Sequence, residues 1–221
     1  MSGPLDTSFD VAIYDIDLFD TSAASIAGLT QAGQIVVCYF SAGSWEAFRP
    51  DAGNFPAEVL GGPLDPPFQD ERWLDIRRID LLAPILRARL DLALSKGWFG
   101  VEPDHVDGYD NISGFALSAV DQLGFNRWIA EEAHSRGVSV GLKKDLAQVT
   151  QLVDDFDWAL NEQCFEFDEC DRLLPFIAAG KAVFGVEYAL DPTSFCATAN
   201  SLNFDWLKKN IERDAERFSC R

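Results

Sequence analysis

Acidic and aromatic side chains follow short apolar runs at several points of this 221-residue chain. The largest group closes the run that begins at Trp98, and it contains Glu102, Asp104, Asp107 and Tyr109. Carboxyl groups that meet in one cleft perturb one another, so that one keeps its proton while another is ionised. Such a pair is suited to general acid catalysis combined with nucleophilic attack.

Comparable residues close other apolar runs. They are Asp15 and Asp17, then Tyr39, Trp45 and Glu46, then Lys143 and Asp145, then Glu162 and Gln163, and finally Glu187 and Tyr188. Cleavage of a glycosidic bond needs one acid to protonate the leaving oxygen and a second group to attack the anomeric carbon or activate water. Each residue alone could instead cap a helix, hold an arginine or pack in the core, so the hypothesis depends on their recurrence.

The apolar runs themselves predict buried parallel strands, which typically lack polar alternation. A glycine precedes four of the runs, as expected just past a helix end, at Gly33, Gly97, Gly137 and Gly180. We predict strands over residues 11–15, 34–41, 98–104, 138–143, 157–161, 181–188 and 203–207.

Segments with helical spacing separate these strands. Residues 81–96 and 118–136 form the longest, and the second opens on a capping-box pattern. Shorter helices are predicted over 147–155 and 171–179, where Pro175 should introduce a kink or delay the start. Residues 49–69 are rich in proline and glycine and predict a long loop.

Alternating strands and helices predict a parallel sheet with right-handed crossovers. An open nucleotide-binding sheet should carry a glycine-rich turn after its first strand, but residues 16–22 contain none. We therefore predict a TIM-type (β/α)8 barrel in one domain over residues 1–221. In that fold the active groups lie at the carboxyl ends of the strands.

The chain is strongly acidic, with 36 acidic and 18 basic side chains and a net charge of −18. This charge argues against binding nucleic acid and suits a neutral or cationic partner, unless the carboxylates serve solubility alone. No run is long and apolar enough to span a membrane, and no signal peptide is visible.

Five cysteines indicate an oxidising compartment. Cys38 lies in an apolar run and reads as a buried thiol. The other four allow three pairings, of which proximity favours Cys164–Cys170 and Cys196–Cys220.

Several runs, taken in order, resemble the endo-α-1,4-polygalactosaminidases of glycoside hydrolase family 114. They are YDIDLFDTS (14–22), CYFSAGSWE (38–46), RWLDIR (72–77), GVEPDHVDGY (100–109), VGLKKD (140–145), NEQCFEFDEC (161–170) and KAVFGVEY (181–188). The resemblance extends from about residue 6 to the C-terminus.

This resemblance implies a secreted (β/α)8 barrel that cleaves internal α-1,4 bonds of galactosamine-containing polysaccharide. It implies that Asp104 is the nucleophile and Glu162 the general acid/base. We expect retention of configuration, with the two carboxyls roughly 5–5.5 Å apart. We expect the subsites to contain Asp15, Asp17, Tyr39, Trp45, Glu46, Asp107, Tyr109, Lys143, Asp145, Gln163, Glu187 and Tyr188. The enzyme should be a monomer that uses no cofactor and no metal.

Two features depart from the family pattern. Lys144 stands where the family usually has asparagine, so it either alters a subsite or turns to solvent. The family also begins with a strand ahead of residue 6, so we expect the barrel to lack its first strand.

Three other hypotheses remain open from the sequence. The chain could be a degenerate, non-catalytic barrel that binds cationic polysaccharide. It could be a lyase or aldolase with a Schiff base on Lys143. It could hold a metal at Asp104, His105 and Asp107, although Pro103 and the tight spacing make this geometry awkward.

Overall fold

The structure is a computed structural model that describes residues 5–212 and 214–221. The chain divides into two compact units, one formed by Val11–Val140 and the other by Met1–Asp10 with Gly141–Arg221. Strand β7 (Ser139–Lys143) contains the point at which the chain passes from the first unit to the second. Each unit has its own parallel strands.

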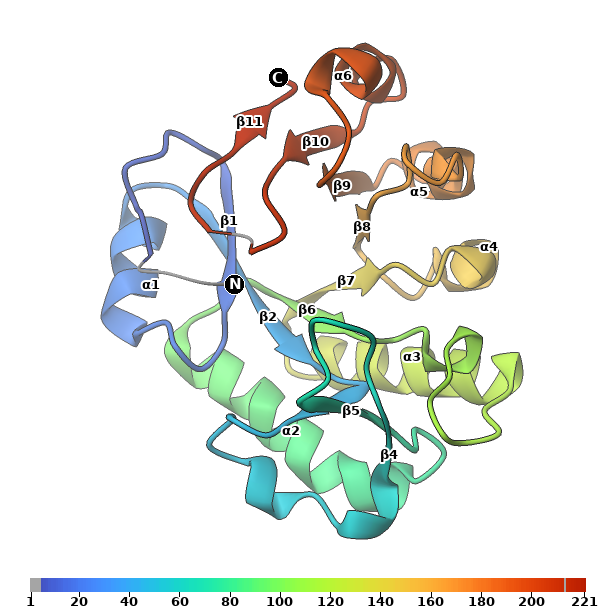
Figure 1. The fold of residues 1–221 in the computed structure, drawn as a ribbon. Helices are drawn as coiled ribbons and strands as arrows, with labels where there is room; N and C mark the ends of the chain where they lie inside the picture. The colour runs from blue at the N-terminus through green and yellow to red at the C-terminus, as the bar shows by residue number, and fades with distance from the viewer. Residues whose placement is uncertain (1–4, 213) are drawn as a thin grey trace. The chain divides into compact units, whose positions relative to one another are not determined.

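Parallel strands and the helices between them build the unit Val11–Val140 (Figure 1). Pairing runs from β1 (Ile13–Asp17) to β2 (Ile35–Ser41), then to β6 (Gly100–Asp104), and then to the start of β7. The helices of this unit are α1 (Ala23–Gln31), α2 (Ile79–Lys96) and α3 (Ala119–His134). The strands and the helices α2 and α3 match predicted ranges with ends displaced by a few residues, whereas no range is predicted for α1.

The unit that contains Gly141–Arg221 repeats the alternation of parallel strands and helices. The end of β7 pairs in parallel with β8 (Trp158–Glu162), which pairs with β9 (Ala182–Glu187) and then β10 (Asp205–Lys208). A short strand, β11 (Phe218–Ser219), runs antiparallel to β10. The helices here are α4 (Val149–Leu152), α5 (Leu174–Ala178) and α6 (Pro192–Ser201).

Glycines mark the helix ends as predicted. Gly33 and Gly97 have φ of 88°, Gly137 has 72° and Gly180 has 73°. This left-handed backbone costs a glycine little, whereas a Cβ would be strained there. The four positions therefore end one element and start the next strand.

Two helix starts also follow the sequence signals. Ser118 and Asp121 form a reciprocal capping box before α3. Pro175 lies in the first turn of α5, where its missing N–H is harmless. The segment predicted as one helix over 171–179 begins as a 3₁₀ helix, Cys170–Leu173, so the proline delays the α-helix rather than kinking it.

The predicted helix over 147–155 is shorter than expected. It consists of a 3₁₀ turn, Leu146–Gln148, followed by the single turn of α4. The left-handed backbone of Asp145 (φ 41°) precedes this turn.

A small antiparallel sheet replaces part of the predicted loop over 49–69. Its strands are β3 (Ser44–Glu46), β5 (Glu71–Leu74) and β4 (Leu60–Pro63), in the order β3-β5-β4. Two 3₁₀ helices, Ala52–Asn54 and Ala57–Val59, precede β4. The predicted loop is therefore wrong for Leu60–Pro63, while the remainder of 49–69 contains turns and two short 3₁₀ helices.

Glycine explains why β4 escapes prediction. A Cβ on Gly61 would lie 2.2 Å from the backbone oxygen of Ser113, and the N–H of Gly62 donates to the same oxygen at 2.8 Å. Close backbone approach thus requires glycine in a strand, where that residue is normally rare.

Tryptophan rings pack over glycines in the strands of the second unit. Gly141 is paired with Trp158, and a Cβ there would lie 2.4 Å from the indole ring. Gly185 is paired with Trp206, and a Cβ there would lie 2.1 Å from that ring. These glycines leave the space that the two buried indoles fill.

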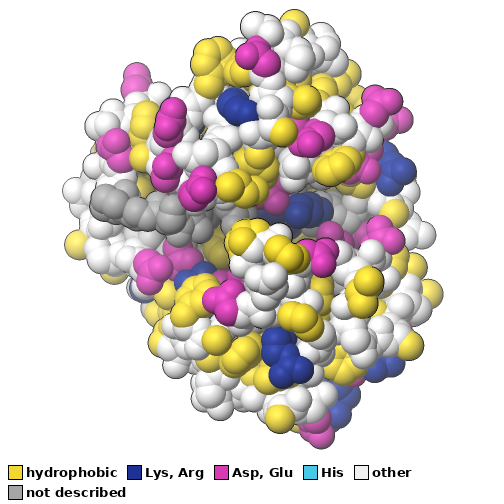
Figure 2. Space-filling view, viewed as in Figure 1, with side chains coloured by type: hydrophobic (Ala, Val, Ile, Leu, Met, Phe, Trp, Pro, Cys, Tyr) yellow, Lys and Arg dark blue, Asp and Glu magenta, His cyan; other side chains and the backbone are white. Residues whose placement is uncertain are grey.

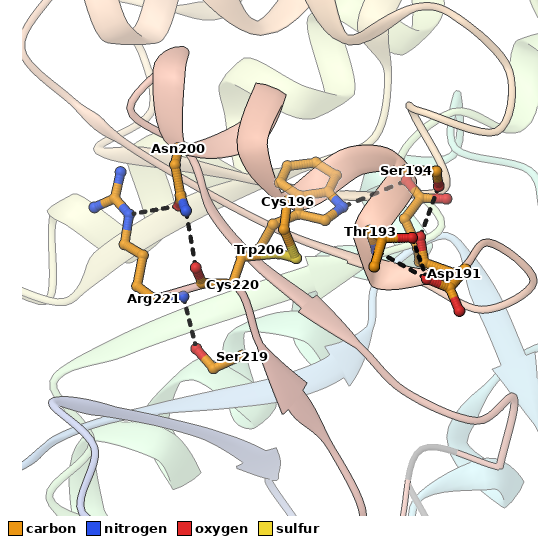
Figure 3. The surroundings of a disulfide bond; sticks show 10 residues. Asp191, Thr193, Ser194, Cys196, Asn200, Trp206, Ser219, Cys220 and Arg221 are labelled. Atoms are coloured by element: carbon orange, nitrogen blue, oxygen red, sulfur yellow. Dashed lines mark hydrogen bonds between the residues drawn. A yellow bond between two sulfur atoms is a disulfide. The ribbon is translucent and has the colours of Figure 1, made fainter.

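Two disulfides, Cys164–Cys170 and Cys196–Cys220, confirm the pairings that proximity favours. The second joins α6 to the last residues of the chain, and the Asn200 amide donates to the backbone oxygen of Cys220 at 2.8 Å (Figure 3). Cys38 is a free, fully buried thiol, and burial raises its pKa well above the ordinary value.

Acidic side chains are spread over much of the visible face, with fewer lysines and arginines among them (Figure 2). Among the described residues, no helix has the length and apolar character needed to cross a membrane.

Candidate active site

Asp104 is the last residue of β6 and is 6% exposed. Its Oδ1 accepts the backbone N–H of His105 at 2.7 Å. Its backbone oxygen accepts the N–H groups of Ala42 at 2.9 Å and Gly43 at 3.1 Å. The turn after β2 therefore holds the end of β6 in place.

His105 turns the chain away from β6 with a left-handed backbone, at φ of 61°. A Cβ on Gly43 would lie 1.8 Å from the backbone oxygen of His105. Gly43 is therefore required because the segments that follow β2 and β6 approach each other closely. The sequence alone does not reveal this reason.

Buried polar side chains connect His105 to the small sheet. We name Glu71, Ser44, Ser41 and His105 the Glu71 relay. Ser44 donates to Glu71 Oε2 at 3.0 Å, and its oxygen lies 2.6 Å from that of Ser41. His105 Nδ1 lies 3.0 Å from Ser41 Oγ and 3.2 Å from Ser44 Oγ. The sequence does not indicate this relay, because Glu71 reaches the site through β5, whose residues show no clear strand pattern.

Arg49 forms an internal ion pair with two of the predicted subsite acids. Its Nη2 lies 2.7 Å from Asp17, and it donates to Glu46 through Nε at 2.9 Å and Nη2 at 2.8 Å. Burial opposes ionisation of Asp17, but hydrogen bonds from Arg49 and from the N–H groups of Asp20 and Phe19 lower its pKa. Both acids thus already have a protein cation beside them, which the sequence does not indicate.

The other subsite candidates of this unit lie on or beside the same strands. Trp45, in β3, donates its indole N–H to the backbone oxygen of Ala52 at 3.0 Å. The half-buried residues are Asp15 in β1, Tyr39 in β2, and Asp107 and Tyr109 after β6. Their roles stay predictions.

Glu162 is the last residue of β8, and three side chains converge on its carboxyl. Tyr188 donates its hydroxyl to Oε1 at 2.6 Å. The ammonium of Lys143 lies 3.8 Å from Oε1, and that of Lys144 lies 3.1 Å from Oε2. Lys208 in turn donates to the backbone oxygen of Tyr188. The carboxyl is therefore held by one hydroxyl and two cations.

Lys144, which stands where the family usually has asparagine, contacts Glu162. Its backbone is left-handed at φ of 50°, and its side chain is 41% exposed while its ammonium contacts Glu162. The side chain of Lys144 therefore does not simply turn to solvent. Asp145, the neighbouring subsite candidate, is buried at 4% exposure.

Glu187 supports the loop that follows Glu162. It is fully buried and accepts the N–H of Phe165 at 3.0 Å and the indole N–H of Trp206 at 3.3 Å. Burial raises the pKa of Glu187, and these hydrogen bonds partly oppose the shift. The same loop is closed by the Cys164–Cys170 bridge. Glu187 therefore has a structural partner in addition to its predicted place in a subsite.

Gln163 begins this loop with a left-handed backbone, at φ of 67°. Its side-chain amide donates to Glu166 at 2.9 Å, and its backbone N–H donates to Val186 at 2.8 Å. The described residues contain no group of three or more histidine, cysteine or acidic side chains placed to hold a metal ion.

Parallel strands joined by helices define an α/β protein of the barrel type, in which the carboxylates of Asp104 and Glu162 close β6 and β8. The sequence model of glycoside-hydrolase family GH114 matches residues 1–221, and the chain belongs to this family. The family that the sequence motifs indicate is therefore confirmed.

Solved structures agree with this assignment. Aspergillus fumigatus Ega3, in a complex with galactosamine, is 39% identical over 98% of this chain and 91% of that chain, with a TM-score of 0.93. The glycoside hydrolase domain of PelA from Pseudomonas aeruginosa is 14% identical over 95% and 91%, with a TM-score of 0.72, which indicates the fold alone. No curated protein sequence matched. The barrel-type fold and the glycosidase activity class are thus confirmed.

Proposed function

We propose that this glycosidase cleaves internal α-1,4 bonds of galactosamine-containing polysaccharide with retention, using Asp104 as nucleophile and Glu162 as general acid/base. The observation that carries the proposal is the setting of Glu162, whose carboxyl is held by Tyr188, Lys143 and Lys144 at the end of β8. A carboxyl held in this way after a parallel strand lies where barrel enzymes place their catalytic groups.

The proposed reaction has two steps. Glu162 donates its proton to the glycosidic oxygen while Asp104 attacks the anomeric carbon, which releases one sugar chain and forms a glycosyl ester. Glu162 then removes a proton from water, and the water displaces Asp104. Between the steps Glu162 is a carboxylate, which can accept the hydrogen bond from the Tyr188 hydroxyl. Asp104 needs its carboxylate form to attack, and the N–H of His105 supports that form.

The substrate class is inferred from similarity and charge. The similar enzyme Ega3 was solved with galactosamine, and this chain carries a net charge of −18. Free amino groups on a galactosamine polymer are cations, which acidic subsites attract. Among the candidate subsite acids, Asp17 and Glu46 share Arg49, and Glu187 is fully buried.

Neutral contacts to the sugars would come from the half-buried rings of Tyr39, Trp45 and Tyr109. Aromatic faces of this kind combine an apolar surface with a polar edge. The two disulfides support a site of action outside the cell, since such bonds persist in oxidising compartments.

Product analysis by mass spectrometry tests the proposal. The enzyme is incubated with partly deacetylated galactosaminogalactan and, in parallel, with glucosamine and glucose polymers. We expect short oligomers from the galactosamine polymer alone. Asp104→Asn and Glu162→Gln should abolish most of this turnover while the circular dichroism spectrum stays that of the wild type. Near-wild-type rates in either variant would contradict the assigned roles, and release of monomers alone would contradict internal cleavage.

A further inference from the structure

The Glu71 relay lies next to Asp104 and has no part in the two-step reaction. Ser41 and Ser44 are fully buried, and Glu71 is 7% exposed. The backbone N–H of Ser44 also donates to Ser41 Oγ at 3.0 Å, which fixes the two hydroxyls relative to each other. The edge of Trp73 packs against the imidazole with ring centres 5.6 Å apart. The relay is therefore a pre-formed connection and not a chance surface contact.

Counting protons along the relay shows that Nδ1 of His105 carries a hydrogen. When Glu71 is ionised its oxygens can only accept, so the single proton of Ser44 points to Glu71. A hydrogen must also lie between the two serine oxygens, which are 2.6 Å apart, and only Ser41 can supply it. Ser41 then has no proton left for the imidazole. His105 Nδ1 must carry its own hydrogen and donate it to Ser41.

We propose that Glu71, acting through Ser44 and Ser41, holds His105 in the Nδ1–H tautomer and is thereby a positioning residue for Asp104. Free imidazole side chains prefer the opposite, Nε2–H tautomer, so the relay imposes the less common state. The hydrogen on Nδ1 points to Ser41 and so fixes the imidazole of the residue whose backbone N–H holds Asp104 Oδ1 at 2.7 Å. The catalytic part of this inference rests on the proposed role of Asp104, whereas the tautomer does not.

The charges around Glu71 set the pH range over which the relay acts. Burial raises the pKa of Glu71, and the carboxylates of Glu46 and Asp104 raise it further, while the Ser44 hydroxyl and the charge that His105 carries when its imidazole is doubly protonated lower it. Glu46 faces Glu71 across the strand pair and is itself bound by Arg49, which also binds Asp17. Glu71 therefore takes up its proton at a higher pH than an exposed glutamate, and control of the tautomer is lost below that point.

Nitrogen NMR of the labelled imidazoles tests the tautomer directly. The chain has two histidines, and the exposed His134 at the end of α3 provides the internal reference for His105. At a pH where both rings are neutral, we expect His105 to show a protonated Nδ1 and an unprotonated Nε2. The opposite assignment in the wild type would overturn the proposal.

Two variants break the relay at different points. Ser44→Ala removes the link and leaves Glu71 in place, while Glu71→Leu removes the acceptor and leaves both serines. Each should return His105 to the Nε2–H tautomer and lower kcat about tenfold with KM nearly unchanged, the equivalent of one lost hydrogen bond. Ser95→Ala, an exposed serine on α2, is the matched control and should change neither. If one breaking variant fails to fold, the other still decides.

The outcomes separate this proposal from the proposed function. An unchanged tautomer in a folded breaking variant would overturn the relay. A changed tautomer with wild-type kcat would overturn the positioning role of Glu71. A wild-type enzyme without activity on galactosamine polymers would instead refute the proposed function, and the tautomer measurement, which needs no substrate, would still decide the relay.

Discussion

The contacts that Tyr188 and Lys144 make with Glu162 differ in the free energy that each can contribute. The Tyr188 hydroxyl is 2.6 Å from the carboxyl and half-buried, and hydrogen bonds to charged groups contribute roughly 1.5–3 kcal/mol. Lys144 is 41% exposed, and ion pairs in contact with solvent contribute roughly 0.2–1 kcal/mol. The hydroxyl should therefore matter more than the second ammonium group.

This difference predicts the order of two variants. Tyr188→Phe should lower kcat by about tenfold or more, whereas Lys144→Asn, which restores the amide usual in the family, should change it by no more than about fivefold. Initial rates at saturating substrate measure both. A larger loss of kcat in Lys144→Asn than in Tyr188→Phe would show that the ammonium group of Lys144 matters more than the Tyr188 hydroxyl.

At the scale of elements, glycines in strands decide where side chains fit. Gly185 in β9 leaves room for the fully buried Trp206 of β10. Gly28 in α1 has no atom within 4 Å of the position where a Cβ would lie. The two positions therefore form a matched pair for the same substitution.

Gly185→Ala should lower the free energy of unfolding by about 1–3 kcal/mol, because the added methyl group would force the fully buried indole of Trp206 to shift. Gly28→Ala should raise it by up to about 1 kcal/mol, because alanine favours the helix. Urea denaturation of both variants measures these changes. Equal effects at the two sites would contradict the packing described for β9 and β10.

The sequence predicts most of the strand and helix framework but not the small sheet. Glycines such as Gly97 and Gly180 follow local rules that hold without knowledge of the fold. Strand β4 does not, because Gly61 is required by a backbone oxygen more than fifty residues away in sequence, that of Ser113. Elements stabilised by distant contacts leave little local pattern.

Some residues of the candidate site can likewise be predicted from the sequence, and others cannot. Motif resemblance locates Asp104 and Glu162, and the strand ends locate Tyr188 and Lys143. The Glu71 relay and the contact of Lys144 with Glu162 depend on turns with left-handed backbone at His105 and Lys144. Tertiary packing brings these side chains together, and the periodicity of the sequence does not predict such contacts.

For the whole molecule, the net charge of −18 should govern association with a cationic polymer. Salt screens such attraction, since the Debye length is about 10 Å at 0.1 M ionic strength and about 3 Å at 1 M. KM for a partly deacetylated galactosamine polymer should therefore rise several-fold with added sodium chloride, while kcat changes little. A fully N-acetylated polymer, which carries no ammonium groups, serves as the control. The same salt dependence for both polymers would show that charge does not select the substrate.

The proposed reaction requires that Asp104 forms a covalent bond to the sugar. A fluorinated galactosaminyl fluoride slows release of such an intermediate, and mass spectrometry of the digested protein then identifies the labelled residue. We expect one added sugar on the peptide that contains Asp104, with no label in Asp104→Asn. A label on any other residue, or hydrolysis with inverted configuration at the anomeric carbon, would contradict it.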